Sequence, residues 1–118
     1  MGGRGNRMSE PRWKIILSDE AKEDMRSLDG SQRVEVFRSI KKVSQNPLPY
    51  NEGGYGKPLG NKKGSELAGC LKIKLRRLGI RIVYILHRTE CGMEIIVVGV
   101  RSGSKVYDIA SERLKKRK

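Results

Sequence analysis

The sequence between residues 71 and 86 carries a row of basic side chains whose spacing suits chemistry on a phosphate. Lysine and arginine alternate with leucine and isoleucine at the start of this stretch, LKIKLRRLGIRIVYIL. Alternation with a period of two is typical of a β-strand that buries one face, so the basic side chains share the other face. Two further groups follow later in the chain. The candidate catalytic residues are Lys72, Lys74, Arg81, Arg101 and Tyr107.

Such a cluster is suited to the cleavage of RNA. The ribose 2′-hydroxyl attacks the adjacent phosphate and leaves a 2′,3′-cyclic phosphate and a 5′-hydroxyl end, so the nucleophile belongs to the substrate. The protein must hold the strand in line, neutralise charge on the phosphoryl oxygens and move protons. Because neighbouring cations disfavour one another's charged forms, we expect a lysine of this cluster and a nearby tyrosine to have a lowered pKa.

The same pattern has a second interpretation, a solvated basic face, since lysines on an edge strand also guard against aggregation. Other residue patterns that are typical of catalytic sites are nearly absent from the chain. The chain has one histidine, His87, and lacks paired carboxylates, a phosphate-binding loop and cysteines at metal-ligand spacing. We interpret His87 as a structural or surface residue, and we expect no metal ion or other cofactor.

The charge of the chain indicates a polyanionic partner. Its 118 residues include 26 Lys and Arg against 13 Asp and Glu, a net charge of +13, which favours nucleic acid or an acidic protein. We expect a flexible basic arm over residues 1–12 and a single domain over residues 13–118. No apolar run approaches the roughly 20 residues of a membrane span, and no apolar leader follows the start, so the sequence predicts a cytoplasmic protein without membrane contact.

The first half of the chain reads as a strand followed by two helices. A short apolar run at residues 13–17 predicts the strand, and Ser18 or Asp19 is expected to cap the first helix. Asp29 and Gly30 end that helix, Ser31 is expected to cap the second, and Asn46-Pro47 ends it. The predicted apolar stripes of the two helices are Ala21, Met25 and Leu28, and Val36, Phe37, Ile40 and Val43.

The basic stretch reads as a β-hairpin. A two-residue turn at Leu78-Gly79 predicts a register in which Lys74 lies opposite Val83 and Arg81 joins the basic face. A three-residue turn would flip the second strand and remove Arg81 from that face. Apolar side chains agree with the first register, which pairs Leu75, Ile73 and Leu71 with Ile82, Tyr84 and Leu86.

The remaining stretches complete an α+β fold. Residues 46–69 show no periodicity, residues 93–100 predict a strand buried on both faces at or beside the sheet centre, and Asp108 is expected to cap a short last helix over residues 109–118. The predicted architecture is an N-terminal strand, a helical hairpin, three further strands of a mainly antiparallel four-stranded sheet, and a short C-terminal helix.

The segments LAGCLKIKLRRLGIRIVYIL and VVGVRSGSKVYDIASERLKK resemble the RelE-type mRNA interferases of the RelE/ParE toxin superfamily, over most of residues 13–117. In that family a lysine pair, two arginines and a C-terminal tyrosine form the ribonuclease site. Those motif positions hold the five candidate residues named above. The arm before Trp13 and residues 50–69 exceed the family pattern.

The resemblance implies a type II toxin that cleaves mRNA in the ribosomal A site and is silenced by a RelB-like antitoxin. The net charge predicts that this antitoxin is acidic, wraps the basic surface as an initially disordered segment and reaches residues 109–118. The alternative is a ParE-like gyrase inhibitor or a non-catalytic nucleic-acid-binding module of the same fold. We expect Arg76, Arg77 and Lys105 to contact RNA or the ribosome.

Within the predicted site, either Tyr107 or Lys72 is the base toward the 2′-hydroxyl, and Arg81 and Lys74 hold the phosphate. Arg101 is a further clamp or the acid for the leaving group, but arginine rarely gives up a proton, so Lys74 competes for the acid role. The chain has one tryptophan, one phenylalanine and four tyrosines. The aromatic residues that we expect to be exposed are Tyr107, Tyr50 and Tyr55. A base-stacking channel is therefore not expected.

Overall fold

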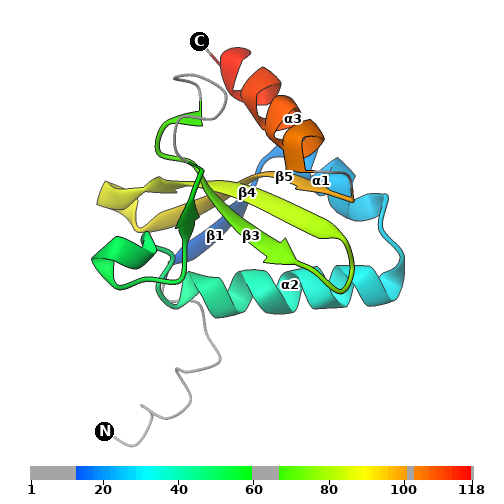
Figure 1. Cartoon of the computed structure of the whole chain (residues 1–118), viewed down its shortest axis with the longest axis horizontal. Helices are drawn as coiled ribbons and strands as arrows, with labels where there is room; N and C mark the ends of the chain where they lie inside the picture. The colour runs from blue at the N-terminus through cyan, green and yellow to red at the C-terminus, as the bar shows by residue number, and fades with distance from the viewer. Residues whose placement is uncertain (1–12, 60–66, 101–102, 118) are drawn as a thin grey trace, which may run out of the picture.

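A mainly antiparallel sheet lies between helices on its two faces (Figure 1). This computed structural model describes residues 13–59, 67–100 and 103–117. The strands are β1 (Lys14–Leu17), β2 (Lys57–Pro58), β3 (Leu71–Leu75), β4 (Ile80–His87) and β5 (Gly92–Gly99). The helices are α1 (Asp19–Arg26), α2 (Gly30–Ser44) and α3 (Gly103–Lys115), with short 3-10 turns η2 (Tyr50–Glu52) and η4 (Arg88–Glu90).

The sheet has five strands in the order β1-β5-β4-β3-β2. β1 pairs with β5 in parallel, and the other neighbours pair antiparallel. The predicted α+β class is confirmed, and β5 lies beside the central strand β4, as its apolar sequence predicted. The strand that the prediction lacked is β2. It has two residues, too few to show a period in the sequence.

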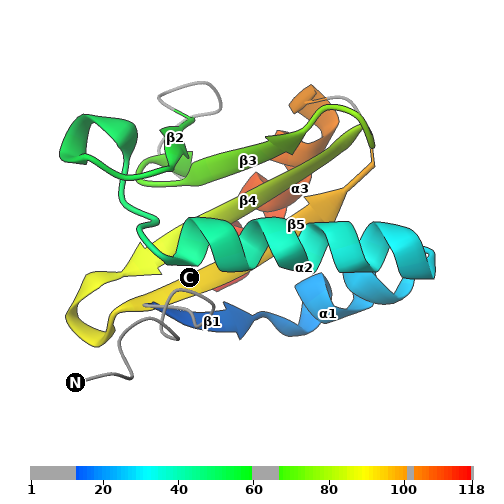
Figure 2. The same cartoon turned by 90° about the horizontal axis from the view of Figure 1, so that it is seen from below.

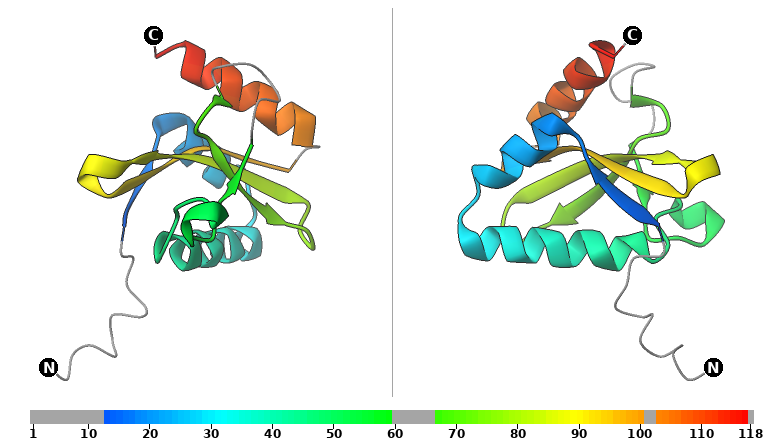
Figure 3. Two further views of the ribbon diagram at one scale, coloured as in Figure 1. Left: turned by 60° about the vertical axis from the view of Figure 1, so that its left-hand side comes forward. Right: turned by 180° about the vertical axis from the view of Figure 1, so that it is seen from behind.

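Two apolar cores lie on opposite faces of the sheet. α2 crosses one face (Figure 2), and α3 lies over the other, with α1 beside β5 (Figure 3). The core under α1 and α2 includes Ala21, Met25, Val36, Ile40, Leu71, Ile82, Tyr84 and Ile95. The core under α3 includes Leu59, Leu67, Val83, Ile96, Val97, Val106, Tyr107 and Ala110. No described helix is long and apolar enough to cross a membrane.

The helix caps explain where α1 and α2 begin. The Ser18 hydroxyl accepts a hydrogen bond from the Ala21 amide at 3.1 Å, which caps α1. At α2 the cap is Asp29, which forms a capping box with Gln32. The prediction of Ser31 as the cap was wrong, because Gly30 is the first residue of the helix rather than a break before it.

The prediction that Phe37 belongs to the buried stripe of α2 was also wrong. Its side chain is 40% exposed, whereas its neighbour Val36 is fully buried. Consecutive residues of a helix are separated by about 100° around its axis. Val36, Ile40 and Val43 complete the stripe against the sheet, and Phe37 falls beyond its margin.

The hairpin is real, but its predicted register was wrong by two residues. Lys74 pairs with Arg81 and Leu75 with Ile80, so the turn runs from Arg76 to Gly79. A two-residue type I′ turn would need positive φ at both central positions; Gly79 has φ +68°, but Leu78 does not. Because side chains alternate with a period of two, the shift leaves every residue on its predicted face.

α3 begins at Gly103, well before the predicted helix at residue 109. Val106 and Tyr107 lie inside it, and Asp108 follows them rather than capping the helix. β-Branched and aromatic residues have modest helix propensity, but burial overrides such preferences. Val106, Tyr107 and Ala110 are all buried against the sheet.

Residues 46–59, predicted to be irregular, form a folded segment that ends in β2. The Tyr84 hydroxyl donates a hydrogen bond of 2.9 Å to the Pro47 carbonyl, and the Tyr50 amide donates to the Gly56 carbonyl at 2.8 Å. A Cβ on Gly56 would lie 2.5 Å from the Tyr84 hydroxyl and 2.4 Å from Leu71 Cδ2. The close approach of this segment to the core therefore requires glycine at position 56.

Gly56→Ala is expected to lower the free energy of unfolding by about 1–3 kcal/mol, because the new methyl group must displace buried atoms. Urea unfolding followed by circular dichroism measures this loss. Gly30→Ala is the matched control, since a Cβ there meets nothing within 4 Å, and it should not destabilise the protein. Equal stability of the two variants would contradict the packing at Gly56.

Candidate functional site

The predicted basic residues lie together on the sheet face that carries α3. Lys72 and Lys74 are on β3, and Arg81 on β4 pairs directly with Lys74. Lys72 pairs with Val83, which belongs to the core under α3. The basic side chains therefore begin where the apolar contact with α3 ends. A hollow of about 230 Å³ at the hairpin end is lined by Lys74, Leu75, Arg76, Gly79, Ile80 and Arg81.

Tyr107 reaches this cluster from α3. The Lys72 Nζ lies 5.8 Å from the centroid of the Tyr107 ring, within the range of a cation–π interaction. The structure corrects one expectation, because Tyr107 is only 6% exposed and is not a surface aromatic. The helix α3 begins earlier than predicted. Tyr107 therefore lies inside α3, which buries this residue against the sheet.

The positive charges of the cluster lower the pKa of one of its lysines, as predicted. The pKa of Lys74 is lowered from the ordinary lysine value, chiefly by the positive charge of Lys72 and then by desolvation. Arg81, Arg76 and Lys57 contribute smaller effects of the same sign. A lowered pKa makes Lys74 a better proton donor at neutral pH than an isolated lysine.

Lys72→Gln should raise the pKa of Lys74, since it removes the largest cause of the lowering. Lys57→Gln should raise it less, because Lys57 has the smallest effect among the named charges. An NMR titration of the Lys74 ε-methylene signal at alkaline pH measures both shifts. An unchanged Lys74 midpoint in Lys72→Gln would show that the two ammonium groups do not interact.

The remaining predicted residues are less tightly grouped. Arg76 and Arg77 are exposed in the turn between β3 and β4, and Lys105 is exposed on the first turns of α3. Arg101 lies outside the described residues, as does the predicted arm over residues 1–12. The structure thus brings Lys72, Lys74, Arg81 and Tyr107 to one face. Among the described residues, no group of three or more His, Cys, Asp or Glu side chains is arranged to hold a metal ion.

The sequence analysis missed the groups that hold α3, and with it Tyr107, on the sheet. Asp24 of α1 accepts hydrogen bonds from Arg113 Nη1 at 2.7 Å and Nη2 at 3.0 Å, and from the Val98 amide at 2.9 Å. This carboxylate joins α1, β5 and α3. A single acidic residue on a helix gives no sequence signal for such a role.

A second carboxylate holds the end of the C-terminal segment. Glu94 on β5 is buried and accepts from Arg117 Nη2 at 2.6 Å, and its Oε1 lies 2.8 Å from His87 Nε2. The hydrogen bond from Arg117 lowers the pKa of Glu94 below its ordinary value. His87 therefore contacts a structural carboxylate, in agreement with its predicted structural role.

The sequence analysis also missed Lys57, which lies on β2 directly opposite Lys72.

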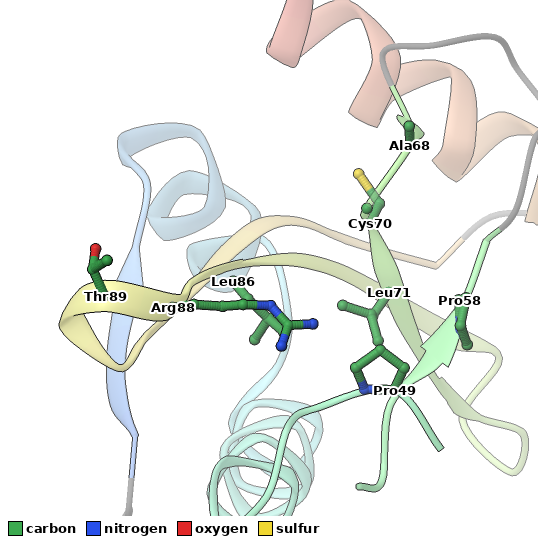
Figure 4. A pocket seen from close by; sticks show the side chains of 9 residues that line it. Pro49, Pro58, Ala68, Cys70, Leu71, Leu86, Arg88 and Thr89 are labelled. Atoms are coloured by element: carbon green, nitrogen blue, oxygen red, sulfur yellow. The ribbon is translucent and has the colours of Figure 1, made fainter. Parts of the chain in front are cut away.

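A cavity of about 560 Å³ lies beside the same strands and is lined by Pro49, Pro58, Ala68, Gly69, Cys70, Leu71, Leu86, Arg88 and Thr89 (Figure 4). Its charged residue, Arg88, is paired with Glu52 at 2.9 Å. None of the candidate catalytic residues lines this cavity.

Comparisons with known proteins agree with the motifs. No protein-family model matches the chain. A curated Escherichia coli protein described as a RelE-like toxin is 28% identical over 104 residues, which cover 88% of this chain and 99% of that protein. A mutant of the E. coli toxin RelE in the free state is 26% identical with a TM-score of 0.66, covering 86% of this chain and 96% of its own.

A chain of the RelBE2 toxin–antitoxin complex of Mycobacterium tuberculosis is 25% identical with a TM-score of 0.60, covering 78% of this chain and 93% of its own. These proteins are similar to the present chain over most of its length. The resemblance to RelE-type toxins that the sequence indicates is confirmed.

Proposed function

We propose that this protein is a RelE-type toxin of a type II toxin–antitoxin system and an endoribonuclease that cleaves mRNA on the ribosome. The observation that carries the proposal is the meeting of Lys72, Lys74 and Arg81 beside Tyr107 on one sheet face. The residues come from the two strands of one hairpin, β3 and β4, and from α3 later in the chain. Similarity to RelE toxins supports the assignment.

In the proposed reaction, the 2′-oxygen of a ribose forms a bond to the adjacent phosphorus, and the bond from phosphorus to the next 5′-oxygen breaks. Tyr107 or Lys72 takes the proton of the 2′-hydroxyl. Arg81 and Lys74 hold the phosphoryl oxygens and offset their growing negative charge. The leaving 5′-oxygen receives a proton from Lys74, whose lowered pKa favours this role, while Arg101 remains a further candidate as a clamp or acid.

The ribosome is proposed to align the substrate. Base stacking on aromatic side chains contributes about 1–3 kcal/mol per base in proteins that grip single-stranded RNA. Of the three tyrosines expected to be exposed, Tyr107 is buried, which leaves only Tyr50 and Tyr55 of the three exposed, too few for a row of stacked bases. We therefore expect the free protein to bind RNA weakly through phosphates, with Arg76, Arg77 and Lys105 adding contacts to RNA or ribosome. The protein would act in the cytoplasm, where translating ribosomes are found.

The proposed protein partner is an acidic RelB-like antitoxin. RelE toxins that share this fold have been solved in complex with RelB antitoxins, and the net charge of +13 favours an acidic partner. We expect the antitoxin to fold on binding, to cover the basic face and to contact the C-terminal part of α3.

Addition of the purified protein to a translating extract tests the proposed function. We expect cleaved mRNA whose new 5′ ends are hydroxyl groups, and no cleavage by a variant that combines Lys74→Ala with Arg81→Ala. Intact mRNA would overturn the proposal. If intact mRNA were accompanied by trapped gyrase–DNA complexes, the ParE-like alternative would replace it.

A further inference from the structure

The short strand β2 adds a basic side chain to the candidate site from a segment that exceeds the family pattern. Lys57 pairs with Lys72, and Pro58 pairs with Leu71. Directly paired residues of antiparallel strands project from the same face, with Cβ atoms about 4.5–5.5 Å apart. Lys57 therefore lies on the face that holds Lys72, Lys74 and Arg81. Like charges in such a pair are destabilising, so a bound anion would relieve their repulsion.

The position of Lys57 is fixed by the residues on both sides of it. Before it, Gly56 contacts Leu71 and Tyr84 so closely that a side chain would not fit. After it, Leu59 is 2% exposed in the core under α3, and its amide donates to the Cys70 carbonyl at 3.1 Å. A lysine anchored on both sides presents its charge at a defined place, as a binding site requires.

Protection of the sheet edge is a weaker explanation for Lys57. Charged residues and proline both protect edge strands from unwanted pairing. The strand β2 is already short, and it contains Pro58, which has no N–H to donate to another strand. The edge strand would therefore be protected from pairing with another chain even without Lys57.

Lys57 also extends the cationic surface beyond the candidate catalytic residues. Its positive charge is one of those that lower the pKa of Lys74. Adjacent strands lie about 4.8 Å apart, so the row from Arg81 on β4 to Lys57 on β2 spans about 10 Å across the sheet. A row of this length exceeds one phosphate group and can hold neighbouring phosphates of a single strand.

We propose that Lys57 binds a phosphate of the RNA next to the scissile one, so that β2 is a second phosphate-binding element of the site. This inference rests on the proposed function. The scissile phosphate lies between Lys74 and Arg81, and the RNA strand continues across β3 toward β2. Lys57 acts in substrate binding and not in proton transfer.

The test measures both RNA binding and ribosomal cleavage for Lys57→Gln. Binding of a fluorescent single-stranded RNA is followed over a salt series, where loss of one phosphate contact lowers the slope of log K against log salt by about 0.7. Lys57→Gln should show this smaller slope and a higher KM for ribosome-bound mRNA, with little change in kcat, because Lys57 has the smallest effect of the charges that lower the pKa of Lys74. Lys57→Arg keeps the charge and should retain the wild-type slope.

Lys14→Gln is the matched control, because Lys14 is an exposed lysine on β1 at the opposite edge of the sheet. It removes the same charge and should leave the slope and KM unchanged. A Lys57→Gln slope equal to that of the wild type would overturn the inference even if the wild type cleaves mRNA. Conversely, a smaller slope with no cleavage by the wild type would reject the proposed ribonuclease and leave the phosphate contact at Lys57 in place.

Discussion

Tyr107→Phe is expected to slow cleavage of ribosome-bound mRNA by about 10²–10⁴-fold, the usual contribution of a proton-transferring group. The substitution removes only the hydroxyl. The ring remains to fill its buried site in α3 and to contact Lys72. RNA affinity and the free energy of unfolding should therefore change little. Single-turnover cleavage on programmed ribosomes and RNA binding to the free protein separate these quantities.

Tyr84→Phe is the matched control for the loss of a buried tyrosine hydroxyl. Tyr84 lies on the opposite face of the sheet and donates its hydrogen bond to Pro47. Its loss should lower the free energy of unfolding by about 1 kcal/mol and leave the cleavage rate of the folded protein intact. A wild-type rate in Tyr107→Phe would remove Tyr107 from the proton transfer and leave Lys72 as the base.

The second large effect is expected from Asp24→Ala, which should lower the free energy of unfolding by about 3–5 kcal/mol. The Asp24 and Arg113 side chains are only 16% and 18% exposed, so the substitution leaves a largely buried guanidinium without its carboxylate. It also leaves the Val98 amide without its acceptor. Whole domains are stable by about 5–15 kcal/mol, so this loss is a large share. Urea unfolding measures it.

Glu23→Ala provides the comparison for Asp24→Ala on the same helix. Glu23 pairs with Arg26, and both side chains are well exposed, so its loss should cost at most about 0.5 kcal/mol. Because Arg113 and Tyr107 are both on α3, Asp24→Ala should also reduce cleavage at temperatures where the protein remains folded. A loss no larger than that of Glu23→Ala would mean that the Asp24 ion pair does not hold α3 in place.

The alternation of apolar and basic residues was sufficient to predict the face of the candidate site, even though the predicted pairing was wrong. Lys74 lies opposite Arg81 rather than Val83. A shift by two residues preserves the side of the sheet on which each side chain lies. Local periodicity determines the face, whereas the number of residues in the turn depends on the backbone angles of Leu78 and Gly79.

Features that depend on contacts between distant segments were not predictable from one sequence. β2 has no periodic pattern of its own and exists because Gly56 and Leu59 fit against the rest of the protein. The early start of α3 results from burial of Val106 and Tyr107, which outweighs their weak helix propensity. Asp24 pairs with Arg113, which is 89 residues away in the sequence. No spacing rule applies at such a sequence separation.

The central claim is that the basic face cleaves RNA by means of the substrate's own 2′-hydroxyl. The most direct measurement uses programmed ribosomes with two mRNAs that differ only by a 2′-deoxy substitution at the nucleotide before the scissile phosphate. The proposed mechanism predicts that the unmodified mRNA is cut to give a 5′-hydroxyl end and that the substituted mRNA stays intact. Equal cleavage of both mRNAs, or no cleavage of the unmodified one, would contradict it.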